Sequence, residues 1–346
     1  MIAALSTLLW SCTKNDNLNN SSLKQSITES SANLNKAVSA ITSSNAYSIL
    51  TVNDGNLKSS ASTTDSSYKV YIPLELIKGI YDYKPGIKMD KWGKPLLSFF
   101  TKSADDSKMI VRMPLEKVTN PFKLRHYIPS DSLLTNNFEI AVSDYHNNYN
   151  NYSDFDYNLA SEISINNAIA GSLNITSQKS HTQGTHYSSQ YAFNGGYTVK
   201  YSNESGDTTV SSFTILNGDN VLYEEKLLTS KNDTARFGHE SQYSLTIGNV
   251  QIVRKSGVHK IDVYLNGVLQ PNAIVTIIDK ENDPEASVCK KRDIQITFED
   301  GTTTTVSTLI GASITNIKTL FESLHSVYFA AYVVDWIAYD IYYQRN

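Results

Sequence analysis

Cysteine is scarce in this chain, with two among 346 residues, and long apolar runs are missing. The sequence has no Cys-x-x-Cys pair and no zinc-type Cys/His cluster, so we expect neither a structural zinc site nor a disulfide framework. No run of 18 apolar residues occurs, so no membrane-spanning helix is predicted. The 30 basic and 34 acidic residues give a net charge of −4. That balance argues against a nucleic-acid partner held by a basic face.

The motifs of common catalytic sites are missing too. The sequence contains no Gly-x-Gly-x-x-Gly, P-loop, Gly-x-Ser-x-Gly or His-Glu-x-x-His pattern. Asp154, Asp156 and Asn158 imitate the start of a calcium loop, but Leu159 stands where that loop needs glycine. No acid–base pair or nucleophile triad can be nominated. We therefore expect a protein that is not an enzyme, with no cofactor and no metal.

Small polar residues and tyrosine are abundant instead. The chain holds 43 Ser, 29 Thr, 31 Asn and 22 Tyr, while only 18% of its residues are charged. This composition is typical of an exported β-rich protein rather than a cytosolic enzyme. An apolar content of 40% supplies enough material for a substantial core.

The N-terminus combines an apolar stretch, Ile2 to Trp10, with the sequence Leu9-Trp10-Ser11-Cys12. This pattern indicates a signal peptide, and its ending resembles a bacterial lipobox. The resemblance implies cleavage after residue 11 and acylation of Cys12 with palmitate-type chains, which would anchor the protein to the outer membrane. Residues 12–22 are almost wholly polar and predict a flexible tether. The alternative is an apolar N-terminal helix of an ordinary protein.

Periodicity predicts the elements of residues 23–346. Apolar residues near a 3.6 spacing indicate a helix over 22–52. Short alternating runs from 138 to 306, joined by Asn/Gly/Asp turns too short for crossover helices, indicate an antiparallel meander. A breaker-rich stretch at 230–241 is a candidate sub-domain boundary. The fold class is α+β: a large curved antiparallel sheet with an N-terminal helix and a long C-terminal amphipathic helix packed against it.

The C-terminal helix is predicted from an apolar seam that runs from Ile317 to Ile341 in alternating steps of three and four. Asp335 and Asp340 lie off this seam, as do Lys318, Glu322 and His325, and they argue against membrane insertion. The expected partner of the seam is the sheet of the same domain, with a partner protein or a lipid surface as the alternative.

The sequence resembles uncharacterised lipoproteins of the Bacteroidota. The likeness rests on the lipobox, Ala37-Val38-Ser39-Ala40-Ile41, Gly79-Ile80-Tyr81-Asp82-Tyr83 and Asn136-Asn137-Phe138-Glu139-Ile140 ahead of the meander. The expected architecture is similar to that of carriers of the LolA and LppX kind, which hold acyl chains. This resemblance implies no activity, and it implies a place on the outer membrane, on its periplasmic or cell-surface side.

Two functions follow as hypotheses. The first is a non-catalytic, membrane-anchored lipoprotein that shelters an apolar or lipid-like ligand between sheet and helices. The alternative is a cell-surface component that binds glycan or protein through the Tyr/Asn-rich segment 144–158, since tyrosine faces beside amides and carboxylates suit sugar recognition. A polar inter-strand loop with no ligand is the simpler interpretation of this segment. The candidate recognition residues are Tyr145, His146, Tyr149, Tyr152, Asp154 and Asp156.

Overall fold

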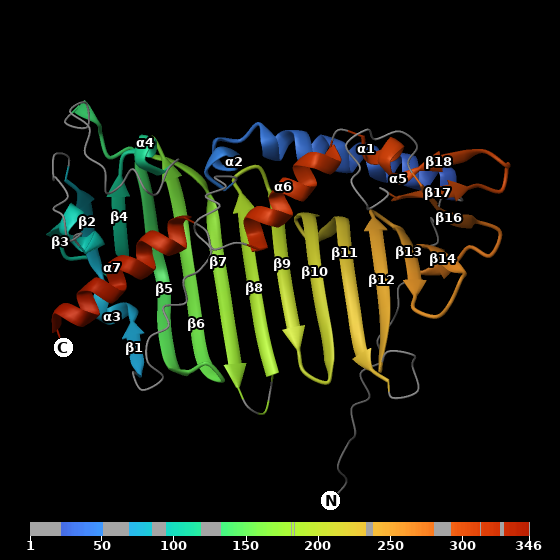
Figure 1. Cartoon of the computed structure of the whole chain (residues 1–346). Coiled ribbons are helices and arrows are strands. Elements are labelled where there is room, and N and C mark those ends of the chain that lie inside the picture. The colour runs from blue at the N-terminus through green and yellow to red at the C-terminus, as the bar shows by residue number, and fades with distance from the viewer. Residues whose placement is uncertain are drawn as a thin grey trace, which may run out of the picture.

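The computed structural model describes residues 22–50, 69–84, 95–118, 133–180, 182, 184–232, 238–279, 292–311, 313–325 and 329–345. The predicted signal peptide, Cys12 and nearly all of the predicted tether lie outside these ranges. The described chain folds into one 15-stranded sheet, a small three-stranded sheet and helices along one end and one face of the large sheet (Figure 1). The predicted α+β class is therefore confirmed.

The large sheet is a meander from β5 to β15, in which each strand pairs with the next antiparallel neighbour. Beyond β5 the order continues β4-β2-β3, and the β2–β4 pair is parallel, so the sheet is mixed rather than wholly antiparallel. β5 also pairs with β1 along its second half. The strands are β1 (Val70–Pro73), β2 (Gly79–Tyr83), β3 (Phe100–Ala104), β4 (Met109–Met113), β5 (Phe138–Asn151), β6 (Asp154–Ile165), β7 (Ala168–Ser180), β8 (Gly184–Phe193), β9 (Tyr197–Ser205), β10 (Thr208–Asn217), β11 (Asn220–Lys231), β12 (His239–Ile247), β13 (Val250–Lys255), β14 (Ile261–Leu265) and β15 (Val268–Leu269).

The small sheet has the order β16-β17-β18. β11 and β12, on either side of the candidate boundary at 230–241, pair along nine residue pairs, from Tyr223–Ile247 to Lys231–His239. The large sheet therefore continues across that stretch. The strands of the small sheet are β16 (Ile274–Asp279), β17 (Arg292–Thr297) and β18 (Thr303–Thr305).

Alternation of side chains divides the large sheet into an apolar and a polar face. One cross-strand row on the apolar face is wholly buried: Tyr191, Val199, Ile215, Tyr223 and Ile247. The neighbouring row points the other way and is polar: Gln190, Lys200, Thr214, Glu224 and Thr246. The helices cover the apolar face, so the core lies between this face and the helices.

Tight turns join the strands where the sequence predicts them. Asn166 and Asn167 have φ of 52° and 63°, and Asn266 and Gly267 have φ of 50° and 78°. Left-handed backbone at both central positions matches the twist of a two-residue hairpin, and Asn and Gly tolerate it best. These turns hold β6 against β7 and β14 against β15.

The N-terminal helix α1 (Leu23–Thr42) begins with a cap, because the Ser22 hydroxyl accepts a hydrogen bond of 3.2 Å from the Gln25 backbone. Its apolar side, with Ile27 and Leu34 fully buried, contacts β11–β13 and three later helices. In Figure 1 it runs along the upper ends of the strands. The shorter helices are α2 (Asn45–Leu50), α3 (Leu74–Ile77), α4 (Leu115–Val118), α5 (Val306–Ile310) and the 3-10 helix η1 (Leu96–Phe99).

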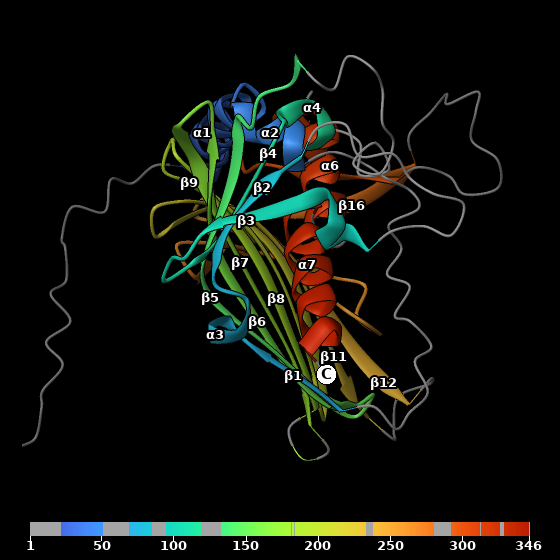
Figure 2. The same ribbon diagram turned by 90° about the vertical axis from the view of Figure 1, so that its left-hand side faces the viewer.

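The C-terminal segment forms two helices, α6 (Ser313–His325) and α7 (Phe329–Arg345), rather than one. Figure 2 shows both on the same side of the sheet. The predicted seam is buried in both helices, with Leu320, Leu324, Val334 and Ala338 at most 1% exposed. Residues 326–328, which include Val327 of the seam, lie outside the described ranges.

The Tyr/Asn-rich segment 144–158 is not a loop. It belongs to β5 and β6, which pair from Phe138–Ile165 to Asn151–Asp154, and only Tyr152 and Ser153 form the turn. β-bulges after Val142 and Tyr149 break the strict alternation. These bulges obscure the period-two pattern that would have predicted the strands.

Candidate functional site

Helix α7 carries aromatic side chains on the side opposite its buried seam. Four of these residues are spaced by four, three and four positions and so form one row along the helix: Tyr332, Trp336, Tyr339 and Tyr343. At 100° per residue this row lies about 180° from the centre of the buried face. Trp336 is 39% exposed and Tyr343 is 56% exposed. Trp336 and Tyr343 therefore present their rings to solvent, whereas Tyr332 and Tyr339 are half-buried and also pack against the core.

Neighbouring rings of this row contact one another. The ring centroids of Tyr332 and Trp336 are 5.5 Å apart, and those of Tyr339 and Tyr343 are 6.2 Å apart in a stacked arrangement. Each ring restricts its neighbour, so the row loses little side-chain entropy when a ligand binds. Aromatic rings held in this way offer flat faces on which an apolar sugar face can stack.

The tip of the β5–β6 hairpin adds two more tyrosines. Tyr149 and Tyr152 pack edge to face with ring centroids 5.9 Å apart, and Tyr152 is 50% exposed. Beside them, the Asn147 amide donates a hydrogen bond of 3.2 Å to the Tyr339 hydroxyl, which joins the hairpin to α7. We call the resulting set the aromatic surface: Tyr149, Tyr152, Tyr332, Trp336, Tyr339 and Tyr343.

A carboxyl group beneath the aromatic surface fastens α7 to the sheet. The Asp335 carboxylate accepts a hydrogen bond of 3.1 Å from each of the Tyr145 and Tyr157 hydroxyls. Burial raises the pKa of Asp335 to about 7, while these two hydrogen bonds act in the opposite direction. Burial, reinforced by the Asp335 charge, raises the pKa of both tyrosines. Asp335 therefore changes charge near neutral pH.

A second carboxylate of α7 holds the other flank of the helix. Asp340 accepts a hydrogen bond of 2.8 Å from the backbone N–H of Leu97 in the first turn of η1. This contact satisfies one of the free N–H groups at the start of that helix. Asp335 and Asp340 thus fix the rotation of α7 about its axis, which keeps the aromatic row turned outward.

The structure divides the six predicted recognition residues into four groups. Tyr149 and Tyr152 lie in the aromatic surface, whereas Tyr145 is 2% exposed and lies under α7. His146 and Asp156 lie on the opposite face of the sheet, with His146 Nε2 3.1 Å from Asp156 Oδ2. Asp154, at the hairpin turn, accepts a hydrogen bond of 3.1 Å from the Asn150 amide. The six residues therefore do not converge on one site.

The α7 members of the aromatic surface are not among the residues predicted from the sequence. Their four-three-four spacing is visible there, but the predicted seam contains only aliphatic and alanine positions. Nothing in the spacing indicates that the β5–β6 hairpin lies beside this helix, because some 190 residues separate Asn147 from Tyr339. Only the folded sheet brings the two rings of the hairpin to α7.

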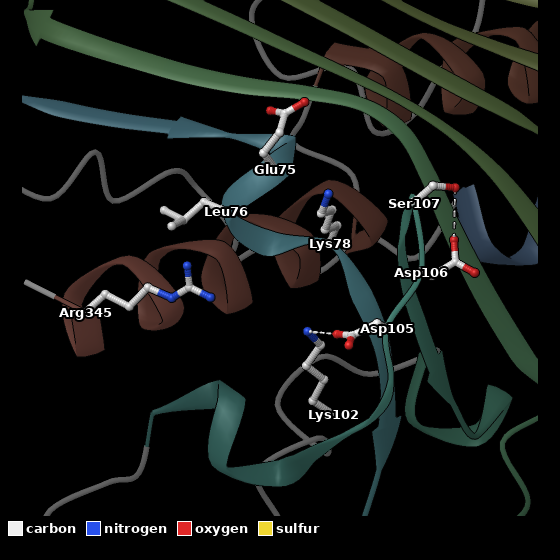
Figure 3. A pocket seen from close by; sticks show the side chains of 8 residues that line it. All are labelled: Glu75, Leu76, Lys78, Lys102, Asp105, Asp106, Ser107 and Arg345. Carbon is white, nitrogen blue, oxygen red and sulfur yellow. Dashed lines mark hydrogen bonds and ion pairs between the residues drawn. The ribbon is translucent and has the colours of Figure 1, made fainter.

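Two of the surface depressions lined by described residues are open and polar. One, of about 600 Å³, lies at the C-terminal end of α7 and is lined mainly by charged side chains (Figure 3). The other, of about 470 Å³, lies between α1 and the β10–β11 and β12–β13 turns and is lined mainly by Ser, Asn and acidic side chains. Neither resembles the apolar groove that a lipid carrier needs.

The chain matches no protein-family model, and no curated protein or solved structure shows significant similarity to it. Within the described ranges, no helix combines the length and the apolar character needed to cross a membrane. The same part of the chain contains no cluster of three or more His, Cys, Asp or Glu side chains suited to a metal ion.

Proposed function

We propose that this protein is a non-catalytic lipoprotein, anchored to the outer membrane through Cys12, that binds polysaccharide on the aromatic surface. The observation that carries the proposal is the exposure of two large rings on the outer side of α7, Trp336 and Tyr343, each beside a half-buried tyrosine of the same row. A helix that only covers a sheet gains nothing from large rings on its outer side, where polar residues would cost less exposed apolar area.

The neighbourhood of the rings supports a sugar ligand over an apolar one. Amides and carboxylates, among them Asn150 and Asp154 at the hairpin tip, lie beside the tyrosines. Sugar rings combine an apolar face, which stacks on aromatics, with hydroxyls that hydrogen-bond to such groups. An acyl chain would instead need an enclosed apolar cavity, whereas Trp336, Tyr343 and Tyr152 are open to solvent.

Affinity electrophoresis of the full-length mature protein in gels that contain single polysaccharides tests this proposal. Replacing Trp336 and Tyr343 together by Ala should abolish retardation. Replacing Tyr149 and Tyr152 by Ala should weaken it about thirtyfold, since two stacked rings at about 1 kcal/mol each contribute about 2 kcal/mol. Tyr71→Ala is a matched control, because Tyr71 is 60% exposed on β1, outside the aromatic surface.

Three results would decide the matter. Retardation lost in the Trp336/Tyr343 variant and kept in Tyr71→Ala supports the proposal. Equal retardation of all variants contradicts it. Binding of the wild-type protein to phosphatidylethanolamine vesicles, without retardation by any glycan, would show that the rings contact a membrane surface instead.

A further inference from the structure

The two outer edges of the large sheet differ in character. β3 forms one edge, and its side chains from Thr101 to Ala104 are exposed and mostly polar, with Lys102 among them. β15 forms the other edge and consists of Val268 and Leu269, which are 63% and 42% exposed. Edge strands that face water usually carry charged side chains, which discourage contact with other molecules. The β3 edge follows this rule and the β15 edge does not.

More exposed aliphatic side chains lie around the β15 edge. Val258 in the turn between β13 and β14 is exposed, and so are Ile274 and Ile277 on β16, the outer strand of the small sheet. β16 contacts β14, and Figure 1 shows the two strands at the same end of the molecule. We call this set the apolar end: Val258, Val268, Leu269, Ile274 and Ile277. Exposed apolar side chains gathered in one region mark an interaction surface.

The predicted lipid anchor is attached next to this end. Ser22 caps α1, and Lys24 in the first turn of the helix donates a hydrogen bond of 2.9 Å to Asp300, which lies between β17 and β18. The Lys24 ammonium also lies 5.9 Å from the centroid of the Phe298 ring. The start of α1 is therefore fastened to the small sheet. Ten peptide units separate Cys12 from Ser22, and an extended chain of that length reaches at most about 35 Å.

The aromatic surface lies beyond the reach of this tether. The order of the sheet places nine strand intervals between β14 and β5, the strand that contacts α7 through Tyr145. At about 4.8 Å per interval the separation is roughly 43 Å, more than the full length of the tether. By contrast, two intervals, or about 10 Å, separate β18 from β16 in the small sheet. Acyl chains on Cys12 can therefore reach the apolar end but not the aromatic surface.

Cations lie beside the apolar end. Arg254 and Lys255 are exposed at the end of β13, ahead of Val258. Lys260 follows in the same turn and approaches Asp262 to 3.7 Å. Aliphatic side chains among cations are typical of a surface that lies on anionic lipid headgroups. A symmetric contact between two copies of this end would bring the like charges together, so a lipid surface fits it better than a second copy does.

We propose that the apolar end lies on the phospholipid headgroups of the membrane that holds the acyl chains, and that this contact keeps the aromatic surface away from the lipid. This inference rests on the anchoring through Cys12 that is part of the proposed function, and it adds the surface that faces the membrane. The acyl chains hold the protein only through the predicted tether, whereas a second contact fixes its orientation. The aromatic surface, at the far end of the sheet, then stays accessible to polysaccharide.

Vesicle flotation of the full-length mature chain with Cys12→Ser tests this inference, because the substitution removes the acyl chains and leaves only direct contacts. This protein should float with vesicles of phosphatidylethanolamine and phosphatidylglycerol. Replacing Val268, Leu269 and Ile274 together by Ser should weaken its partition by a factor of about ten or more. Ile169→Ser is the matched control, because Ile169 is 51% exposed at the start of β7, outside the apolar end.

A second lipid composition separates charge from apolar contact. Arg254→Gln/Lys255→Gln should weaken partition into the anionic vesicles but not into phosphatidylcholine vesicles, which carry no net charge. Partition that falls in this variant and is unchanged in the triple Ser variant contradicts the proposal, because the cations alone would then hold the protein on the lipid.

The remaining outcomes distinguish this inference from the proposed function. Loss of partition in the triple Ser variant, with partition kept in Ile169→Ser and in the Trp336/Tyr343 variant, supports lipid docking. Equal partition of all variants, or none for the Cys12→Ser protein, overturns docking and leaves glycan retardation, which the triple variant should keep, as a separate result. A Cys12→Ser dimer in sedimentation that dissociates in the triple variant also overturns docking, because the apolar end then binds a second copy. An unmodified Cys12 in the wild-type protein, measured by mass spectrometry, contradicts the anchoring and this inference with it.

Discussion

Helices α6 and α7 cover the same face of the same sheet, yet their outer sides differ. The outer side of α6 is polar, and its Lys318 and Glu322 approach each other to 3.6 Å. The outer side of α7 carries the aromatic row, and its flanks carry Asp335 and Asp340. Burial of the seam and of the adjoining edge of Phe321 accounts for the packing of α6, although Ile314 is 44% exposed beside it. Burial of the seam does not explain the exposed rings or the carboxylates of α7. These side chains, which the packing of the helix does not require, point to a binding function.

The two helices also differ in how they are fastened. Phe321 of α6 packs edge to face with Tyr201 and Phe213, at centroid distances of 5.7 and 5.5 Å. α7 adds polar contacts, from Asp335 to Tyr145 and Tyr157 and from Asp340 to Leu97. Apolar contacts hold in any orientation that buries area, whereas hydrogen bonds fix one rotation of the helix. The polar contacts suit a helix whose outer row must face one way.

The largest effect is expected in the apolar packing of α6. Leu324 is fully buried, so Leu324→Ala should lower the free energy of unfolding by roughly 2–5 kcal/mol. The loss should be the same at pH 5 and pH 8, because no titrating group takes part in that contact. Urea denaturation followed by circular dichroism at both pH values measures it. If the loss of stability differs by more than about 1 kcal/mol between pH 5 and pH 8, α6 is also held by titrating groups and does not differ from α7 in this respect.

A pH-dependent effect is expected in α7. The pKa of Asp335 is raised from 3.8 to about 7, so between these values the folded state binds a proton that the unfolded state has released. Stability contributed here is therefore present below about pH 4 and is lost as the pH rises towards 7. Asp335→Asn keeps a neutral acceptor for Tyr145 and Tyr157, and it should stabilise the protein at pH 8 by about 1–3 kcal/mol and change little at pH 4.

The measurement is the free energy of unfolding from pH 4 to pH 8.5 for the wild type and Asp335→Asn. Within the described residues the groups facing this carboxyl are the hydroxyls of Tyr145, Tyr157 and Tyr339 and the Asn147 amide, and no cation is paired with it. Asp340→Asn is the control, since it neutralises the other carboxylate of α7, which accepts a hydrogen bond from the Leu97 backbone rather than from the two tyrosines. If the wild-type and Asp335→Asn profiles run parallel, Asp335 does not titrate in this range.

Much of this fold is predictable from the sequence, because the patterns that specify it involve residues close together in the chain. The meander strands are marked by alternation and by turns such as Asn166-Asn167 and Asn266-Gly267, which need only a few neighbouring residues to act. The helix seam from Ile317 to Ile341 is a similar short-range pattern. The parallel β2–β4 pair was not predictable, because nothing near residues 79–83 specifies a partner 30 residues away.

The candidate site was only partly predictable for the same reason. The sequence marks Tyr149 and Tyr152 as candidates, but Tyr145, four residues earlier, has the same local context and is buried. The bulge after Val142 and the carboxyl of Asp335 decide that difference. Asp335 lies off the seam, and this position suggests a solvent-exposed charge. In the fold it is partly buried because it accepts hydrogen bonds from the tyrosines of β5 and β6.

A smaller effect is expected for the hydroxyl of Tyr157. Tyr157→Phe removes one hydrogen bond to Asp335 and should cost about 1 kcal/mol of stability. Since that bond lowers the pKa of Asp335, its loss should also move the pH-dependent decline in stability to higher pH. Tyr191→Phe on β8 is the control, because the Tyr191 hydroxyl makes no hydrogen bond within the described residues. Equal effects of the two substitutions would show that the Asp335 contact contributes nothing specific.

The smallest effect is expected on the outer side of α6. Lys318 and Glu322 lie four residues apart with side chains 75% and 52% exposed. Water and salt screen such a pair, so Lys318→Ala should change the free energy of unfolding by less than about 0.5 kcal/mol. On the outer side of α7, Tyr343→Ala should be similarly mild for stability and yet weaken retention by polysaccharide. Urea denaturation and affinity electrophoresis of the two variants measure both properties. If Tyr343→Ala instead destabilises the protein by more than 2 kcal/mol, the aromatic row serves the fold, and the contrast between the two helices loses its functional meaning.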